Sequence, residues 1–110
     1  MSLKFEITKS DGGEFFFKLL NTDGRTLLRS EGYKAKASCT NGIESVRRNA
    51  GDDKRYAPLT ASDGRPYFNL TATNGQIIGT SPMFADAAAC AAAIAATKTG
   101  AASATVDDKS

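Results

Sequence analysis

The sequence repeats itself at a constant offset of 51 residues. Identical or similar residues recur at this spacing: Phe17 and Phe68, Leu19 and Leu70, Ser30 and Ser81, Cys39 and Cys90, Ile43 and Ile94. Because the offset never changes, the two copies should share one order of secondary-structure elements. A half of about 50 residues would be only marginally stable alone, whereas the whole chain can bury a modest core. We therefore expect a single domain, 1–110, with repeat one at 3–53, repeat two at 54–106 and a loose tail at 107–110.

The composition excludes several chemistries. The chain has no histidine and only 2 cysteines, so it lacks the usual general base of nucleophile triads and the thiolates of a zinc site. Its net charge of +2 is small for a nucleic-acid binder. The sequence has no apolar run long enough to cross a bilayer, and its start lacks the pattern of a signal peptide. These features predict a cytoplasmic protein without a membrane segment, a metal or a cofactor.

Each repeat is predicted to form three strands followed by a helix. Alternating apolar residues over 3–8 indicate a half-buried strand, and the segments 15–20 and 25–30 indicate two more. Asp23-Gly24 is typical of a two-residue type I′ hairpin between the second and third strands, as is Asn74-Gly75 in repeat two.

Single residues mark the edges and ends of these elements. Pro58 has no backbone donor, so the first strand of repeat two should be broken or lie at a sheet edge. Asp86 is a good N-cap for a second helix that is mostly alanine over 87–96. Within the first helix, Gly42 costs about 1 kcal/mol relative to alanine, which predicts that a neighbouring segment passes close to it. The second helix carries Ala93 at the equivalent position.

Strand parity and helix periodicity predict one core shared by both repeats. One apolar face of the first helix is marked by residues spaced four, three and four apart: Cys39, Ile43, Val46 and Ala50. The predicted core consists of Phe17, Leu19, Ile43, Phe68, Leu70 and Ile94. We expect Cys39 and Cys90 to be free and buried as small hydrophobic residues, rather than to form a redox pair.

Four runs of residues carry a resemblance to a known family: Glu31–Ser38, Asn41–Ala50, Tyr67–Leu70 and Asn74–Ser81. They resemble the YegP-like family of uncharacterised bacterial proteins, in its tandem-repeat branch, over nearly the whole chain. The resemblance implies two β(3)-α-β units that share one antiparallel sheet and exchange terminal strands. Single-copy relatives build the same object as a dimer, so it also implies a monomer here. It implies no activity and no catalytic residues, and the second helix departs from the family pattern at 92–97.

We therefore predict an α+β fold in which two pseudo-symmetric β-β-β-α repeats share one mainly antiparallel sheet with both helices on one face. A two-residue hairpin would place Leu20 opposite Leu27 and Lys18 opposite Arg29. The uncovered face is then predicted to carry Phe16, Lys18, Leu20, Arg25, Leu27 and Arg29 from repeat one, and Tyr67, Asn69, Thr71, Ile78 and Thr80 from repeat two. The candidate partner-binding face consists of Phe16, Lys18, Arg29, Tyr67 and Asn69.

Several functions remain open for this face. The leading hypothesis is a small non-enzymatic binding or interaction module whose partner is unknown, with a protein as one candidate. The alternative is weak binding of single-stranded nucleic acid, because aromatic residues interleaved with cations resemble a stacking platform. An enzyme acting through carboxylates ranks last, because Asp11, Asp23 and Asp63 lie at turns, where aspartate makes local hydrogen bonds. The outer apolar side chains can also simply shield one another.

Basic residues also gather around the first helix: Lys34, Lys36, Arg47, Arg48, Lys54 and Arg55. Such a set is usually a solvated face. The other interpretation is a phosphate-binding strip, which would be one-sided because repeat two has only Lys98 in the corresponding region.

Overall fold

The repeat reappears as two copies of one order of elements. The structure, a computed structural model, describes residues 3–110. The first copy contains β1 (Lys4–Lys9), β2 (Phe15–Leu20), β3 (Thr26–Arg29) and α1 (Lys36–Asn49). The second contains β4 (Tyr56–Thr60), β5 (Pro66–Thr71), β6 (Ile77–Thr80) and α2 (Ala87–Gly100). A 3-10 turn η1 (Asp53–Arg55) joins the copies, and η2 (Ala101–Ser103) and β7 (Thr105–Asp108) follow α2.

All seven strands form one sheet in the order β4-β5-β6-β3-β2-β1-β7. Neighbouring strands are antiparallel except β1 and β7, which are parallel. The two repeats meet between β3 and β6, where Arg29 pairs with Thr80, its own counterpart in the other repeat. The pseudo-twofold axis therefore passes through this pair, and the predicted α+β fold with two pseudo-symmetric halves is confirmed.

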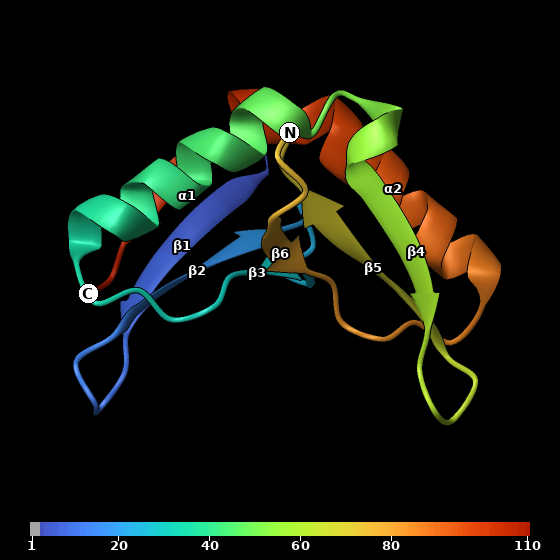
Figure 1. The fold of residues 1–110 in the computed structure, drawn as a ribbon, viewed down its shortest axis with the longest axis horizontal. Helices are drawn as coiled ribbons and strands as arrows, with labels where there is room; N and C mark the ends of the chain where they lie inside the picture. Colours follow the sequence, from blue (N-terminus) through green and yellow to red (C-terminus); the bar gives the residue numbers. More distant parts are fainter. Residues whose placement is uncertain (1–2) are drawn as a thin grey trace.

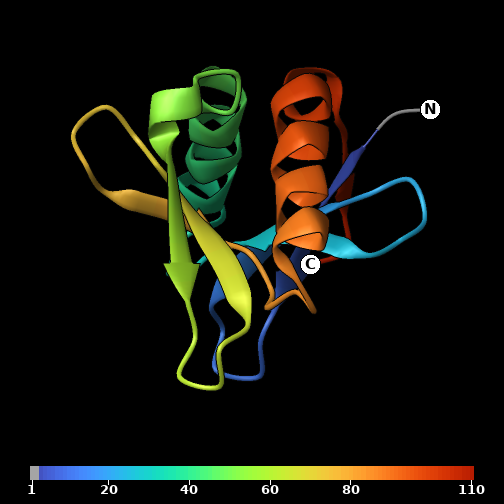
Figure 2. The same cartoon turned by 90° about the vertical axis from the view of Figure 1, so that its right-hand side faces the viewer.

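Both helices lie on one side of the sheet. Figure 1 shows α1 and α2 above the two halves of the sheet, which slope down from the middle. In Figure 2 the helices stand side by side over the same face, with their C-terminal ends together at the top. α2 begins as predicted after Asp86, whose carboxylate accepts a hydrogen bond from Ala89 N–H at 2.8 Å. No helix within residues 3–110 is long and apolar enough to cross a membrane.

The core lies between the sheet and the two helices. Five of the six predicted core residues have at most 1% of their surface exposed: Phe17, Leu19, Ile43, Phe68 and Leu70. Ile94 is only partly buried, so this part of the prediction is wrong. It borders a small apolar hollow beside β4, with Pro58 and Leu59 on the opposite wall. The hollow remains because no strand covers the outer edge of β4, whereas β7 covers the corresponding edge of β1.

Pro58 explains how the outer edge of β4 stays unpaired. Phe68, opposite Pro58, directs its N–H and C=O toward Ser81 on the side of β6. The backbone at position 58 therefore points outward, where a strand without a proline would offer a free donor. The predicted edge position of this strand is confirmed.

The C-terminal segment is more ordered than predicted. Thr105–Asp108 forms β7, and Lys109 N–H donates a hydrogen bond to Ile7 O at 2.8 Å. The expectation of a loose tail at 107–110 is therefore wrong for Asp107 and Asp108, because β1 offers an unpaired edge to them and Lys36 forms a 2.8 Å ion pair with Asp108. β7 follows repeat two along the chain but pairs with repeat one, as the implied exchange of terminal strands requires.

The β2–β3 and β5–β6 hairpins differ from the predicted type I′ turns. Gly24 N–H donates to Asn21 O at 2.9 Å and Asn21 N–H to Arg25 O at 2.8 Å, so this loop has three residues. Among the described residues only glycines have positive φ, and a type I′ turn would also require it of Asp23. The two-residue prediction is therefore wrong here and at Asn74-Gly75, which forms the same loop.

A β-bulge compensates for the longer loop. Leu20 pairs with Thr26 instead of Leu27, which becomes the extra residue of β3. Leu27 is buried and lines a hollow with residues of α2, and the matching shift places Ile78 against residues of α1. The prediction that Leu27 and Ile78 lie on the uncovered face is therefore wrong.

The attachment of β7 gives the first testable prediction. The hydrogen bond from Lys36, followed by those from Ser110, lowers the pKa of Asp108 to about 2. We expect Lys36→Met to raise this pKa toward the ordinary value of about 3.9, as measured by NMR titration of the side-chain carboxyl group. Because the folded pKa lies below the unfolded one, the stabilisation is fully present above about pH 4 and is lost as the pH falls toward 2.

Asp63 provides the control for this titration. Hydrogen bonds from Arg65 lower its pKa, so Lys36→Met should leave it unchanged. An Asp108 pKa that stays near 2 in Lys36→Met would show that Lys36 does not hold β7 in place.

Candidate functional site

The sheet face away from the helices carries one continuous row of cross-strand neighbours. The row crosses all seven strands through Asp107, Glu6, Lys18, Arg29, Thr80, Asn69 and Ala57. Buried residues flank the row along the strands, such as Phe17 and Leu19 on β2, so its own side chains point to the open face. We call this set the open-face row. It brings together three of the five predicted site residues.

Two cations stand side by side at the centre of the open-face row. Lys18 and Arg29 are both exposed and directly opposite each other. Ser30 N–H bonds to Phe17 O in the adjacent pair, so Lys18 and Arg29 form a non-hydrogen-bonded pair, in which side chains approach most closely. Neither cation forms an ion pair with any residue of 3–110. Like charges facing each other across strands are destabilising, so a bound anion would relieve this repulsion.

The equivalent positions in repeat two are neutral. Asn69 stands at the position of Lys18 and Thr80 at that of Arg29. Thr80 Oγ1–H donates a 2.8 Å hydrogen bond to Asn69 Oδ1, which leaves the Asn69 amide donors directed to the open face. The row therefore carries two cations on one side of the axis and a neutral amide donor, that of Asn69, on the other.

The two predicted aromatic residues flank the row on β2 and β5. Phe16 and Tyr67 are equivalent in the repeat, and both are partly buried. Phe16 lies against the segment that follows β3, because a Cβ at Gly32 would lie 3.0 Å from Phe16 Cζ. Tyr67 pairs with Leu59 of the edge strand. The bulges also place Leu27 and Ile78 on the helix side of the sheet. The apolar part of the open face is therefore smaller than simple alternation along the strands predicts.

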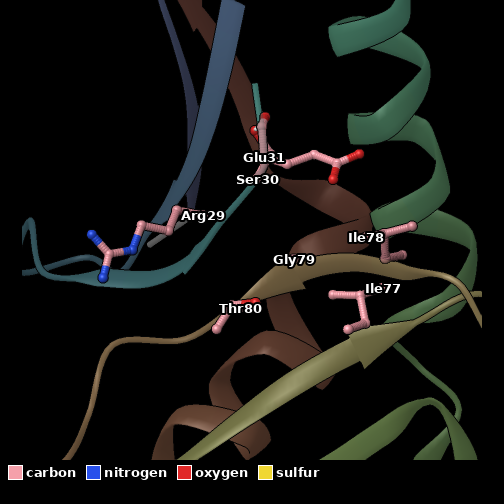
Figure 3. Close-up of a pocket in the computed structure, with 7 residues that line it drawn as sticks. All are labelled: Arg29, Ser30, Glu31, Ile77, Ile78, Gly79 and Thr80. Carbon is pink, nitrogen blue, oxygen red and sulfur yellow. Dashed lines mark hydrogen bonds between the residues drawn. The ribbon is translucent and has the colours of Figure 1, made fainter. Parts of the chain in front are cut away.

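A hollow of about 300 Å³ opens beside the single Arg29–Thr80 bridge, where β3 and β6 diverge. Figure 3 shows that Arg29 and Glu31 extend in opposite directions from its rim. Glu31 therefore does not neutralise the central cations. Gly79 stands where repeat one has Leu28, and the Leu28 side chain fills the space beside it: a Cβ at Gly79 would lie 2.6 Å from Leu28 Cγ.

Both cysteines are buried and free, as expected. Burial raises the pKa of the Cys39 thiol, to which Asp108 adds a smaller contribution, and burial raises that of Cys90. Neither thiol is therefore suited to nucleophilic chemistry. Within the described part of the chain, no group of three histidine, cysteine, aspartate or glutamate side chains could hold a metal ion.

The sequence analysis missed the acidic end of the open-face row. Glu6 was not named for this face, although its alternation with Phe5 and Ile7 was a signal for it, and Asp107 was expected in the loose tail. Glu6 forms a 3.2 Å ion pair with Lys109, and Asp107 a 3.6 Å pair with Lys4. These carboxylates are thus partly neutralised across the β1–β7 pair, by Lys109 and Lys4. Lys18 has Glu6 as its other cross-strand neighbour, but neither Lys18 nor Arg29 forms an ion pair within the described residues.

Comparison with known proteins gives consistent matches over the whole chain. A family model described as a domain of unknown function (DUF1508) matches twice, at residues 10–56 and 61–108. The UPF0339 protein YegP of Escherichia coli is 46% identical over 104 residues, which cover 94% of each chain. A UPF0339 protein of Acinetobacter baylyi is 44% identical over 108 residues, or 98% of this chain and 97% of that one.

Two solved structures share the fold. The solution structure of a UPF0339 protein from Shewanella oneidensis has a TM-score of 0.92 and 41% identity, and the match covers 98% of this chain and 92% of that one. The solution structure of E. coli yegP, described as a protein of unknown function, has a TM-score of 0.92 and 45% identity, with 99% and 94% covered. None of these names states an activity, a ligand or a nucleic acid.

Proposed function

The chain belongs to the DUF1508 family of unknown function, and from this premise we propose a function based on its own surface: a non-enzymatic module that binds an acidic segment of a partner protein on the open face of its sheet. The adjacent Lys18 and Arg29 at the centre of the open-face row, which form no ion pair within the described residues, are the observation that carries this proposal. Arginine suits bidentate contact with a carboxylate, and lysine adds a second positive charge beside it.

The shifted carboxyl groups support a non-enzymatic role. A general acid or base near neutral pH needs a carboxyl pKa raised toward 7. Among the described residues, every carboxyl group with a shifted pKa has it lowered: Asp52, Asp63 and Asp108. Backbone hydrogen bonds are the first cause at Asp52 and Asp63, which makes these residues local turn-formers.

The same surface favours a protein over a single-stranded nucleic acid. A stacking platform needs accessible rings, whereas Phe16 and Tyr67 are partly buried and lie on opposite halves of the sheet. The cationic part of the open-face row consists only of Lys18 and Arg29, whereas single strands are bound by a longer positively charged groove. An acidic peptide can place its carboxylates over the cations alone and meet the Asn69 amide on the other side of the axis.

We further propose that the protein is a monomer in the cytoplasm. Two buried free thiols suit a reducing compartment. Duplication supplies both halves of the sheet within one chain, β7 covers one outer edge, and Pro58 removes an outward donor from the other. The two remaining edges disfavour pairing with a second copy, because β4 carries Pro58 and β7 is a strand of 4 residues that ends in Asp107-Asp108.

The test uses the repeat as its own source of variants. Lys18→Asn with Arg29→Thr gives repeat one the residues that repeat two carries at the same sites, so the fold should be retained. Binding of a fluorescent oligoglutamate peptide, followed by anisotropy at low salt, should weaken at least about tenfold, because hydrogen bonds to charged groups contribute about 1.5–3 kcal/mol each. Lys34→Ser with Lys54→Ser is the matched control, since it removes two exposed cations away from the row.

Equal loss of peptide binding in the two double variants would show that only net charge matters and would overturn the proposal. Tighter binding of single-stranded oligothymidine than of the peptide, with a steep dependence on salt, would identify a nucleic-acid binder instead.

A further inference from the structure

A second, polar hollow lies on the helix side of the sheet, away from the open-face row. It occupies about 500 Å³ between the C-terminal half of α1 and the β5–β6 hairpin. Its polar lining comes from Ser45, Arg48, Asn49, Thr73, Asn74 and Gln76. The lining contains one charged side chain, Arg48, and no carboxylate.

The pseudo-symmetry supplies a comparison for this hollow. The corresponding space between α2 and the β2–β3 hairpin has about half the volume, about 240 Å³. It is lined on the helix side by alanines and contains the cation Arg25, which pairs with Asp23 at 3.6 Å. The same arrangement of elements thus forms a small hollow with a neutralised cation in one half and a larger polar hollow with an uncompensated cation in the other.

The polar groups around Arg48 are only partly satisfied by the protein. Arg48 forms no ion pair with the described residues. Asn49 is 9% exposed, and its amide donates to Ser45 O at 2.8 Å, so its Oδ1 is left to accept a further hydrogen bond. Asn74 Oδ1 accepts a 3.0 Å bond from Gln76 N–H, which leaves the Asn74 amide as a donor. The C-terminal end of α1 accounts for a cation at position 48, but it does not account for these surrounding donors.

We propose that this hollow binds a small oxyanion, with Arg48 as its charged contact. The guanidinium can hold two oxygens of a phosphate or carboxylate group in its planar fork. The hydroxyl and amide groups of Ser45, Thr73 and Asn74 supply further donors. Hydrogen phosphate carries an O–H that Asn49 Oδ1 can accept, whereas an ionised carboxylate has none, so phosphate binds more tightly than acetate.

The experiment is an NMR titration of the intact protein with sodium phosphate or sodium acetate, at constant ionic strength. Backbone amides at 45–49 and 73–76 should shift along a saturable curve, with phosphate the tighter ligand. Arg48→Gln should weaken phosphate binding at least about tenfold, because it removes the charge-assisted hydrogen bonds of the guanidinium group. Arg48→Lys, which keeps the charge without the fork, should bind with intermediate affinity.

Arg25→Gln is the matched control, because it removes the cation of the corresponding hollow and should leave phosphate binding unchanged. Acetate binding as tight as phosphate would assign the site to carboxylates. Amide shifts that do not saturate would overturn the proposal, as would an equal loss of phosphate affinity in Arg25→Gln and Arg48→Gln. Either result would mean that phosphate acts only through general charge screening. Because Arg48 is exposed, its variants should have unchanged melting curves. This measurement checks that the titrations compare folded proteins.

Discussion

Phe68→Ala is expected to lower the free energy of unfolding by about 3–5 kcal/mol, because truncating a fully buried ring loses its transfer free energy and leaves a cavity. Phe68 has 0% of its surface exposed. Its ring centroid lies 5.6 Å from that of Tyr56 and 6.4 Å from that of Phe84, to which it is nearly parallel. A domain of ordinary stability, about 5–15 kcal/mol, would lose a large fraction of its total.

Urea denaturation followed by circular dichroism measures this loss. Tyr67→Ala is the control, since it removes an aromatic ring one residue away that is only partly buried. Its cost should be clearly smaller. Equal midpoints for the two variants would mean that the ring of Phe68 is not the centre of the second half of the core.

Gly42→Ala is the second large expected effect, and it has an internal rescue. A Cβ at Gly42 would lie 2.7 Å from Tyr33 Oη and 2.9 Å from Phe17 Cε2, which confirms the predicted close approach. Overpacking of this kind costs about 1–3 kcal/mol. The gain of about 1 kcal/mol in helix propensity offsets part of that cost. We expect a net loss of stability in a thermal or urea melt.

The second repeat shows how the clash is avoided there. Ala93 stands at the position of Gly42 and Phe84 at that of Tyr33, so the methyl group is present where the hydroxyl is absent. Tyr33 Oη forms no hydrogen bond within the described residues, and Tyr33→Phe alone should be nearly neutral. Added to Gly42→Ala, it should recover most of the lost stability. If the two changes were simply additive, the hydroxyl would not be the obstacle and the helix would have shifted instead.

Much of the fold follows from local signals. The constant offset set the order of elements, and Asp86, Pro58 and Gly42 each play the part that their chemistry predicts. The predicted turn type of the hairpins was wrong because Asp-Gly suits both a type I′ turn and a three-residue loop. The choice between them depends on the bulge that packs Leu27 against α2. The predicted burial of Ile94 was wrong because it depends on whether a strand covers the outer edge of β4. The spacing of apolar residues along the second helix cannot reveal this.

The candidate site was predictable where alternation along a strand determines on which face of the sheet a side chain lies. Lys18, Arg29 and Asn69 lie on the open face and in one row, as predicted. Their alternation with buried residues fixes the face, and the pairing of Lys18 with Arg29 and of Asn69 with Thr80 fixes the row. Asp107 escaped prediction because its position depends on a partner strand at the other end of the chain. The hollow around Arg48 also has no local signal, since it arises between a helix of one repeat and a hairpin of the other.

The parallel pairing of β1 with β7 has a consequence for synthesis of the protein. It joins Lys4 to Thr105, so β1 receives its outer neighbour only after β2–β6 and both helices have emerged from the ribosome. Until then the nascent chain carries an uncovered strand edge, the kind of surface at which partly folded chains associate. The outer edge of β4 stays unpaired in the finished fold as well, and there Pro58 removes one of its donors. Aggregation during expression should therefore depend on β7 more than on any change at the surface of the finished fold.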